Sequence, residues 1–122
     1  MDKEIFWSDE GIQIKYKGDL YLNDIIAVNR LISNNPKYIF IKYQISDFLG
    51  LTSLSMSKKD IESLSEFQVI PTILKPNLKL AVVSDNNDFR EKVLEFIDLM
   101  KYNDWNIKLF NNLVEAKEWC EE

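Results

Sequence analysis

The alternation of apolar and polar residues near the N-terminus predicts a β-hairpin. Residues 12–17 read Ile-Gln-Ile-Lys-Tyr-Lys, and this strict alternation places every second side chain on one face of a half-buried strand. A short apolar run at residues 5–7 precedes the strand, and residues 9–11 between them have the composition of a turn. We therefore predict two antiparallel strands, the second of which ends at Gly18-Asp19.

The rest of the chain alternates between two apolar patterns. Four segments have apolar residues at near-helical spacing and are predicted helices: 20–33, 57–67, 88–102 and the residues after Asn112. Three segments are short apolar runs and are predicted strands: 38–45, 78–83 and 106–110. Ser57 and Asp60 have the spacing of a capping box at the second helix, and residues 46–55 before it are predicted to be a loop.

The resulting order, β-β-α-β-α-β-α-β-α, predicts the α/β class. Strands that alternate with helices form a mostly parallel sheet joined by right-handed crossovers. We expect one domain over residues 1–122, with a mixed five-stranded sheet and four helices. Six apolar side chains are expected to be buried: Ile14, Ile41, Leu80, Val82, Phe96 and Ile97.

Polar residues on the predicted strands indicate that one sheet face is partly open. Gln13, Lys15 and Lys17 share one face of their strand, and Lys42 and Gln44 share one face of theirs. A parallel sheet covered on both faces would have nearly continuous apolar strands. The polar face is either an edge strand in contact with water or a surface closed by a second copy or by another protein.

Composition narrows the chemistry available to the chain. It has 122 residues, of which 46% are hydrophobic, and a net charge of −5 that disfavours nonspecific binding to nucleic acid and to anionic membranes. Residues 1–60 carry eight basic and eight acidic side chains, whereas residues 61–122 carry seven basic and twelve acidic side chains.

The chain has no histidine and one cysteine, Cys120. Catalytic triads with histidine, zinc sites and internal disulfides are therefore excluded. Three glycines do not form a phosphate-binding loop, so we expect no cofactor. We also expect no membrane insertion. A single cysteine is typical of a reducing compartment, so we expect a cytoplasmic setting.

Two groups of polar residues follow the predicted strands and could carry chemistry. Asp47 and Asp85 are expected just beyond two central strands, where ligands bind in open α/β sheets. They could hold Mg²⁺ together with Asp88, or they could serve as turn and cap residues. The hydroxyl-rich stretch with Ser53, Ser55 and Ser57 precedes a helix, so these serines could accept a phosphate, or Ser57 could cap the helix.

Four stretches of the chain resemble a known family. They are residues 12–18, the segment 38–48, Leu80-Ala81-Val82-Val83 and the ending 108–119. In these stretches the chain is similar to the STAS/SpoIIAA-like group of bacterial domains, which includes anti-sigma factor antagonists, and is more distantly similar to lipid-binding Sec14 domains. Antagonists have an Asp-Ser-Ser-Gly phosphorylation segment where residues 50–55 here read Gly-Leu-Thr-Ser-Leu-Ser, so the resemblance implies no phospho-acceptor.

The pattern and the resemblance together predict binding rather than catalysis. We expect an interaction or regulatory module whose partner is a protein, with a second copy of the chain as one option, docked through the hairpin face or residues 46–57. The candidate partner-binding residues are Lys15, Lys17, Lys42, Asp47, Ser53, Ser55, Ser57 and Asp85. The Sec14 likeness implies an alternative, a carrier of a small apolar or lipid-like ligand. A carboxylate enzyme that uses Asp47 and Asp85 is a third hypothesis.

Overall fold

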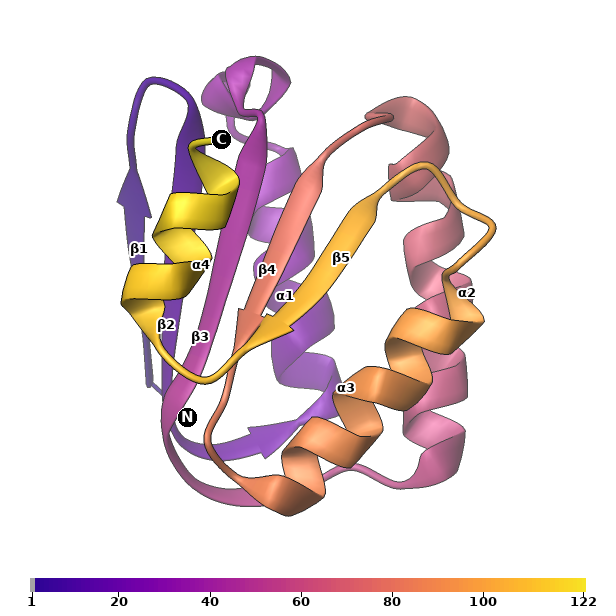
Figure 1. Ribbon diagram of the computed structural model, residues 1–122. Coiled ribbons are helices and arrows are strands. Elements are labelled where there is room, and N and C mark those ends of the chain that lie inside the picture. Colours follow the sequence, from indigo (N-terminus) through magenta and orange to yellow (C-terminus); the bar gives the residue numbers. More distant parts are fainter. Residues whose placement is uncertain (1) are drawn as a thin grey trace.

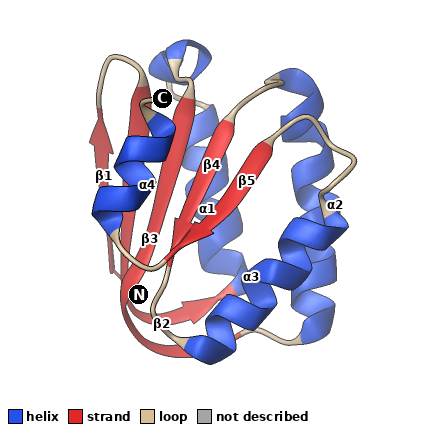
Figure 2. Cartoon of the chain, in the orientation of Figure 1, coloured by secondary structure: helices blue, strands red, loops and turns tan. Residues whose placement is uncertain are grey.

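The computed structural model describes residues 2–122 (Figure 1, Figure 2). Ten elements follow one another along the chain: β1 (Asp2–Trp7), β2 (Gly11–Tyr21), α1 (Leu22–Ser33), the 3₁₀ turn η1 (Pro36–Phe40), β3 (Tyr43–Ser55), α2 (Lys58–Leu74), β4 (Lys79–Val83), α3 (Asn87–Leu99), β5 (Asn106–Phe110) and α4 (Leu113–Cys120). Apart from the added turn η1, this is the predicted order of strands and helices.

The five strands lie in the sheet in the same order as in the sequence, β1-β2-β3-β4-β5. β1 pairs with β2 in antiparallel orientation, and each later strand is parallel to the one before it. The mixed, mostly parallel sheet is therefore confirmed, and β4 lies inside it with a partner on each side.

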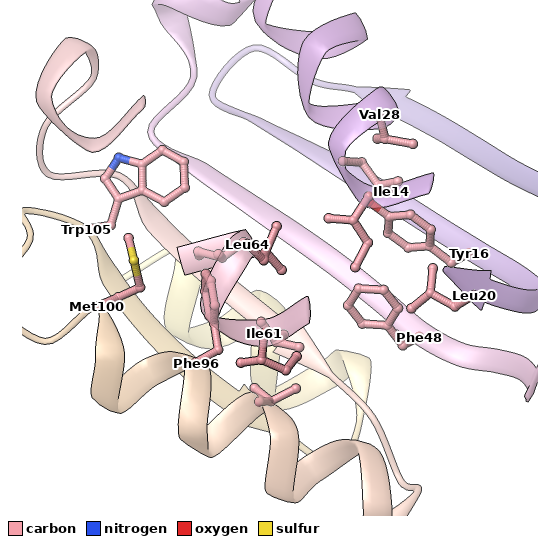
Figure 3. Packing of buried hydrophobic residues seen from close by; sticks show 14 of the residues in the cluster. Ile14, Tyr16, Leu20, Val28, Phe48, Ile61, Leu64, Phe96, Met100 and Trp105 are labelled. Carbon is pink, nitrogen blue, oxygen red and sulfur yellow. The ribbon is translucent and has the colours of Figure 1, made fainter. Parts of the chain in front are cut away.

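The helices cover the two faces of the sheet unequally. The larger core cluster joins one face to α1, α2 and α3, and Figure 3 shows its side chains, among them Ile14, Phe48, Leu64 and Phe96. The smaller cluster joins the other face to α4, which lies in front of the sheet in Figure 1. We call these the three-helix face and the α4 face. Five of the six expected core residues are buried, and Ile97 is half-buried.

The segment predicted as the strand 38–45 is different in the structure. Residues 36–40 form η1, because Pro36 occupies the first turn and the Asn35 side chain accepts a hydrogen bond from the Lys37 N–H at 2.9 Å. Only residues 43–45 of the predicted strand belong to β3. Ile39 is consequently exposed rather than central in the sheet.

Residues 46–55, predicted as a loop, are most of β3. They are in a strand because β2 continues beyond Gly18-Asp19 and pairs with them as far as Tyr21–Ser55. Gly18 has φ 86° and lies at an irregularity in the pairing, a conformation that glycine adopts without steric cost. α1 therefore begins at Leu22 rather than residue 20.

α2 is longer than predicted and includes a proline. It begins at the expected capping box, in which the Ser57 hydroxyl accepts from the Asp60 N–H at 3.1 Å and the Asp60 carboxylate accepts from the Ser57 N–H at 2.9 Å. It runs seven residues beyond Phe67 and contains Pro71. Its second half, residues 68–74, has no charged side chain.

Candidate functional site

Three of the predicted binding residues lie on the α4 face of the sheet. Lys15 is opposite Asp47 in the β2–β3 register, and both side chains are on the side away from the buried Tyr16. Lys17 is on the same side, where its Nζ is 2.7 Å from a Glu4 carboxylate oxygen. The ion pair with Lys17 lowers the pKa of Glu4.

Asp47 is not at the end of a strand, as predicted, but in the middle of β3. It is 1% exposed, level with Val83 of β4. Its Oδ1 accepts a hydrogen bond from the Leu49 N–H at 2.9 Å, whereas its Oδ2 has no hydrogen-bond partner among residues 2–122. The prediction was wrong because β3 continues past Asp47 to pair with the extended β2.

Lys42 and Gln44 do not contribute to an open sheet face. Lys42 precedes β3, and its Nζ is 3.2 Å from a Glu10 carboxylate oxygen at the hairpin turn. That position is five residues along β2 from Lys15, on the order of 16 Å at the usual rise of a strand. Gln44 is buried on the three-helix face, opposite Ile12 and Leu80.

The three predicted serines have separate local roles. The Ser53 hydroxyl donates to Asp19 Oδ1 at 2.5 Å, and Thr52 donates to the same atom at 3.0 Å. These hydrogen bonds, that from Ser53 first, lower the pKa of Asp19. Ser55 is exposed at the end of β3, and Ser57 caps α2.

Asp85 lies just beyond β4, as predicted, and it is exposed while Asp47 is buried. Within residues 2–122, no three Asp, Glu or Cys side chains form a group that could hold a metal ion. The Mg²⁺ arrangement with Asp88 is therefore not formed in this part of the chain. No helix among these residues has the length and apolar character to cross a bilayer.

An exposed apolar groove lies where η1 meets the end of α2. Its volume is about 450 Å³, and it is lined by Ser33, Asn34, Tyr38, Ile39, Ile70, Pro71, Leu74 and Lys75. Ile39 is 74% exposed and Leu74 is 79% exposed, and Phe40 and Ile73 on the same two elements are also largely exposed. We call this the α2 groove.

One basic side chain, Lys75, lines the α2 groove, and two others lie on α1 and η1, which contribute to its walls, in a chain that is acidic overall. The Lys75 Nζ is 3.3 Å from the Ile39 carbonyl oxygen and 5.3 Å from the centre of the Tyr38 ring, and burial lowers its pKa. The Arg30 guanidinium is 5.7 Å from the centre of the Phe67 ring, and Lys37 is exposed within η1. The nearest carboxylate along α2 is Glu66, about one turn before Ile70.

The sequence patterns did not predict the α2 groove, because they indicated a helix that ends at Phe67 and a strand that contains Tyr38 and Ile39. One signal was present in the sequence. Five of the six residues 69–74, Val-Ile-Pro-Thr-Ile-Leu, are apolar and none is charged, whereas a surface helix normally has one apolar stripe and a polar face. A run of this kind needs either burial on all sides or a partner.

A second cavity, of about 60 Å³, lies inside the larger core. Its floor is the three-helix face of the sheet, with Tyr16, Gln44, Ser46, Leu80 and Val82, and its other walls come from α1, α2 and α3. Figure 3 shows Tyr16, Phe48, Ile61, Leu64 and Phe96 around this region. We call it the core cavity.

Comparison with known proteins identifies the fold. No protein-family model and no curated protein match the chain. Among solved structures, it is similar to an uncharacterised protein of the DUF3478 family from Shewanella loihica PV-4, which has a SpoIIAA-like fold. The TM-score is 0.55 at 16% identity, over 98% of this chain and 92% of the other. The α/β, SpoIIAA-like fold expected from the resemblance is thereby confirmed.

Proposed function

We propose that this SpoIIAA-like chain is a non-catalytic interaction module and that the α2 groove receives a helical segment of another protein. The observation that carries the proposal is the group of exposed large aliphatic side chains on η1 and the second half of α2. Large apolar side chains that gather on one exposed surface are typical of interaction sites, whereas single exposed ones are common on any protein. The resemblance to regulatory SpoIIAA-like domains supports the same class of function.

The chemistry around the groove favours an acidic amphipathic partner. Its apolar lining fits the apolar stripe of a helix laid along it, and Arg30, Lys37 and Lys75 favour carboxylates beside that stripe. The net charge of −5 opposes an extended anionic membrane more than a short acidic segment, because the membrane carries many charges and the segment carries few.

Fluorescence anisotropy with a labelled amphipathic Leu/Glu peptide tests the proposal, and the matching Leu/Lys peptide is the charge control. We expect the wild type to bind the Leu/Glu peptide more tightly, with an affinity that falls as salt is added. Ile70→Glu should weaken binding at least ~10-fold, because it places a carboxylate in the centre of the apolar contact. Leu94→Glu, at an exposed leucine on α3 outside the groove, should bind as the wild type does.

Three results would overturn this proposal. The first is equal binding of the two peptides, and the second is unchanged binding by Ile70→Glu. The third has two parts. The Leu/Glu peptide does not bind the wild type, and the wild type instead cosediments with phosphatidylglycerol vesicles or self-associates in sedimentation velocity. Ile70→Glu abolishes that cosedimentation or self-association. That result would assign the groove to a membrane or to a second copy.

The hairpin face is a second candidate surface, because Lys15 and Lys17 lie on the thinly covered α4 face. Lys42 is beside Glu10 at the hairpin turn and not on this face. The variant that tests this face therefore reverses two charges, Lys15→Glu with Lys17→Glu. If a partner docks there, this double variant should lose the partner while Ile70→Glu retains it. The same two variants therefore distinguish the two surfaces in one binding assay.

The carrier alternative is limited by size. A pocket that encloses a drug-sized ligand has a volume of roughly 300–1,000 Å³, whereas the core cavity has about 60 Å³. A whole lipid tail does not fit in this conformation. A much smaller ligand is compatible with the cavity.

A further inference from the structure

β1 is an edge strand whose outer side is open. Among residues 2–122, β1 pairs with β2 alone, and Figure 1 shows it at the outer edge of the sheet. Its register with β2 is unbroken over residues 2–7, and this segment contains no proline and no glycine. A bulge or a proline often prevents a further strand from pairing with a sheet edge, and β1 has neither.

The hairpin hydrogen bonds show which backbone groups of β1 point out of the sheet. The Ser8 N–H donates to the Gly11 carbonyl at 2.9 Å, so Ser8 directs its backbone groups toward β2. The direction of these groups alternates from residue to residue along a strand. The N–H and C=O groups of Lys3, Ile5 and Trp7 therefore point to the open edge.

Both faces of β1 carry apolar side chains that a further strand would cover. On the three-helix face, Ile5 and Trp7 are only half-buried against the larger core cluster. On the α4 face, Phe6 is opposite Gln13 and is 50% exposed. In Figure 1, α1, α2 and α3 lie to the right of β1, so they leave its outer side free for another strand.

We propose that β1 pairs with β1 of a second copy of the chain, antiparallel about a two-fold axis that passes beside Ile5. Antiparallel strands exchange hydrogen bonds where residues with outward backbone groups lie opposite each other. In the register centred on Ile5, Ile5 lies opposite Ile5 of the second copy, and Lys3 lies opposite Trp7. All of the outward N–H and C=O groups then have partners, and the two sheets become one.

The order of side chains in β1 favours this register over its neighbours. It places Glu4 opposite Phe6 of the second copy, and the Lys3 ammonium beside the Trp7 ring, a favourable cation–π arrangement. A register centred on Glu4 would place the two Glu4 carboxylates opposite each other, which is destabilising. A register centred on Phe6 would pair only residues 5–7 of the strand. The Ile5-centred register is thus the one in which β1 complements itself in both charge and length.

Sedimentation velocity of the full chain over a range of concentrations tests the proposal. We expect the wild type to dimerise reversibly. Lys3→Pro removes an outward N–H but no hydrogen bond to β2, so it should weaken the dimer at least ~10-fold with an unchanged circular dichroism spectrum. The matched control Lys3→Ala keeps the N–H, and its dissociation constant should stay within ~3-fold of the wild-type value.

Two substitutions at Phe6 test the register. Phe6→Lys places an ammonium opposite Glu4 of the second copy, whereas Phe6→Glu places a carboxylate there. Because each dimer contains this position twice, Phe6→Lys should dimerise at least ~5-fold more tightly than Phe6→Glu. Adding Glu4→Lys to Phe6→Glu makes the pair attractive again and should restore the dimer.

The proposal is wrong if the wild type stays monomeric up to ~1 mM, or if Lys3→Pro dimerises as tightly as Lys3→Ala. Equal dimerisation of Phe6→Lys and Phe6→Glu would exclude the Ile5-centred register. The inference is independent of the α2 groove, so Ile70→Glu should leave the dimer intact. A dimer that Ile70→Glu abolishes would instead form through the groove and would overturn the pairing of β1.

Discussion

The Asp47 carboxylate occupies an unusual place for an acidic group, the interior of a β-sheet. One oxygen accepts the Leu49 N–H, and the other has no partner among residues 2–122. A buried ionised oxygen without a partner is destabilising unless a cation compensates for it. Asp47→Asn keeps the acceptor for Leu49 and removes the charge, so its free energy of unfolding should equal or exceed that of the wild type.

Urea denaturation measures this effect, with Asp47→Ala as the comparison. The alanine variant leaves the Leu49 N–H unpaired and should lose ~1–3 kcal/mol. A loss of more than about 1 kcal/mol in Asp47→Asn would contradict the expectation. It would show that this buried position accommodates a carboxylate better than an amide, whose two N–H donors would also lack a partner.

The Cys120 thiol predicts a dependence of stability on alkaline pH. Burial raises its pKa to about 11 from an ordinary value of 9.0. In the unfolded chain the thiol loses its proton from about pH 9 upward, whereas in the folded chain it stays protonated to about pH 11. Ionisation therefore favours the unfolded state, and the stability that the thiol contributes is lost as pH rises from 9 to 11.

Denaturant midpoints across this pH range, for the wild type and Cys120→Ala, check the prediction. The wild type should lose more stability than the variant between pH 9 and 11. Burial also raises the pKa of Tyr16, but Tyr16 is present in both proteins and its contribution cancels in the comparison. Parallel curves for the two proteins would show that Cys120 ionises normally in the fold.

At the scale of elements, Lys79 of β4 holds the C-terminal end of α4 to the sheet. The Lys79 Nζ donates to the Trp119 carbonyl at 2.9 Å and to the Glu122 carbonyl at 3.4 Å, and it lies 5.4 Å from the centre of the Trp119 ring. A cation beside the last carbonyls of a helix pairs with groups that have no partner in the helix and favours the negative end of its dipole.

Lys79→Met should therefore lower the free energy of unfolding by ~1–2 kcal/mol. Hydrogen exchange of the α4 amides should accelerate more than that of α1. Lys108→Met, at an exposed lysine of the neighbouring β5, serves as the control and should change stability by less than ~0.5 kcal/mol. Equal losses in the two variants would show that the carbonyl contacts of Lys79 do not stabilise α4.

Local sequence patterns predicted some of the strands and helices correctly but not others. The capping box at Ser57, the apolar run of β4 and the alternation in β2 are local patterns, and each produced the expected element. The strand 38–45 failed because the β-forming character of Tyr38 and Ile39 competes with the local turn that Asn35 and Pro36 impose. The length of β3 depends on its pairing with an extended β2, which no pattern within β3 reveals.

At the scale of the whole molecule, the candidate sites depend on residues that are distant in the sequence. The α2 groove joins η1 to the end of α2, and the core cavity is the volume that remains between the sheet and three helices. Neither has a motif, because their lining residues share only a place in the fold. The acidic excess and the absence of histidine restricted the classes of chemistry, but they did not indicate a surface.

The order β1-β2-β3-β4-β5 in the sheet also has a consequence for how the chain acquires its fold. Each strand after the first is placed beside the strand that precedes it, so the loops that must close are short and their entropic cost is low. The sheet can grow from the N-terminus in the order of synthesis, with each crossover helix covering the strands already paired. Folding should therefore be fast for an α/β domain, and α4, which follows β5 in the chain, would close the second face after the strands have paired.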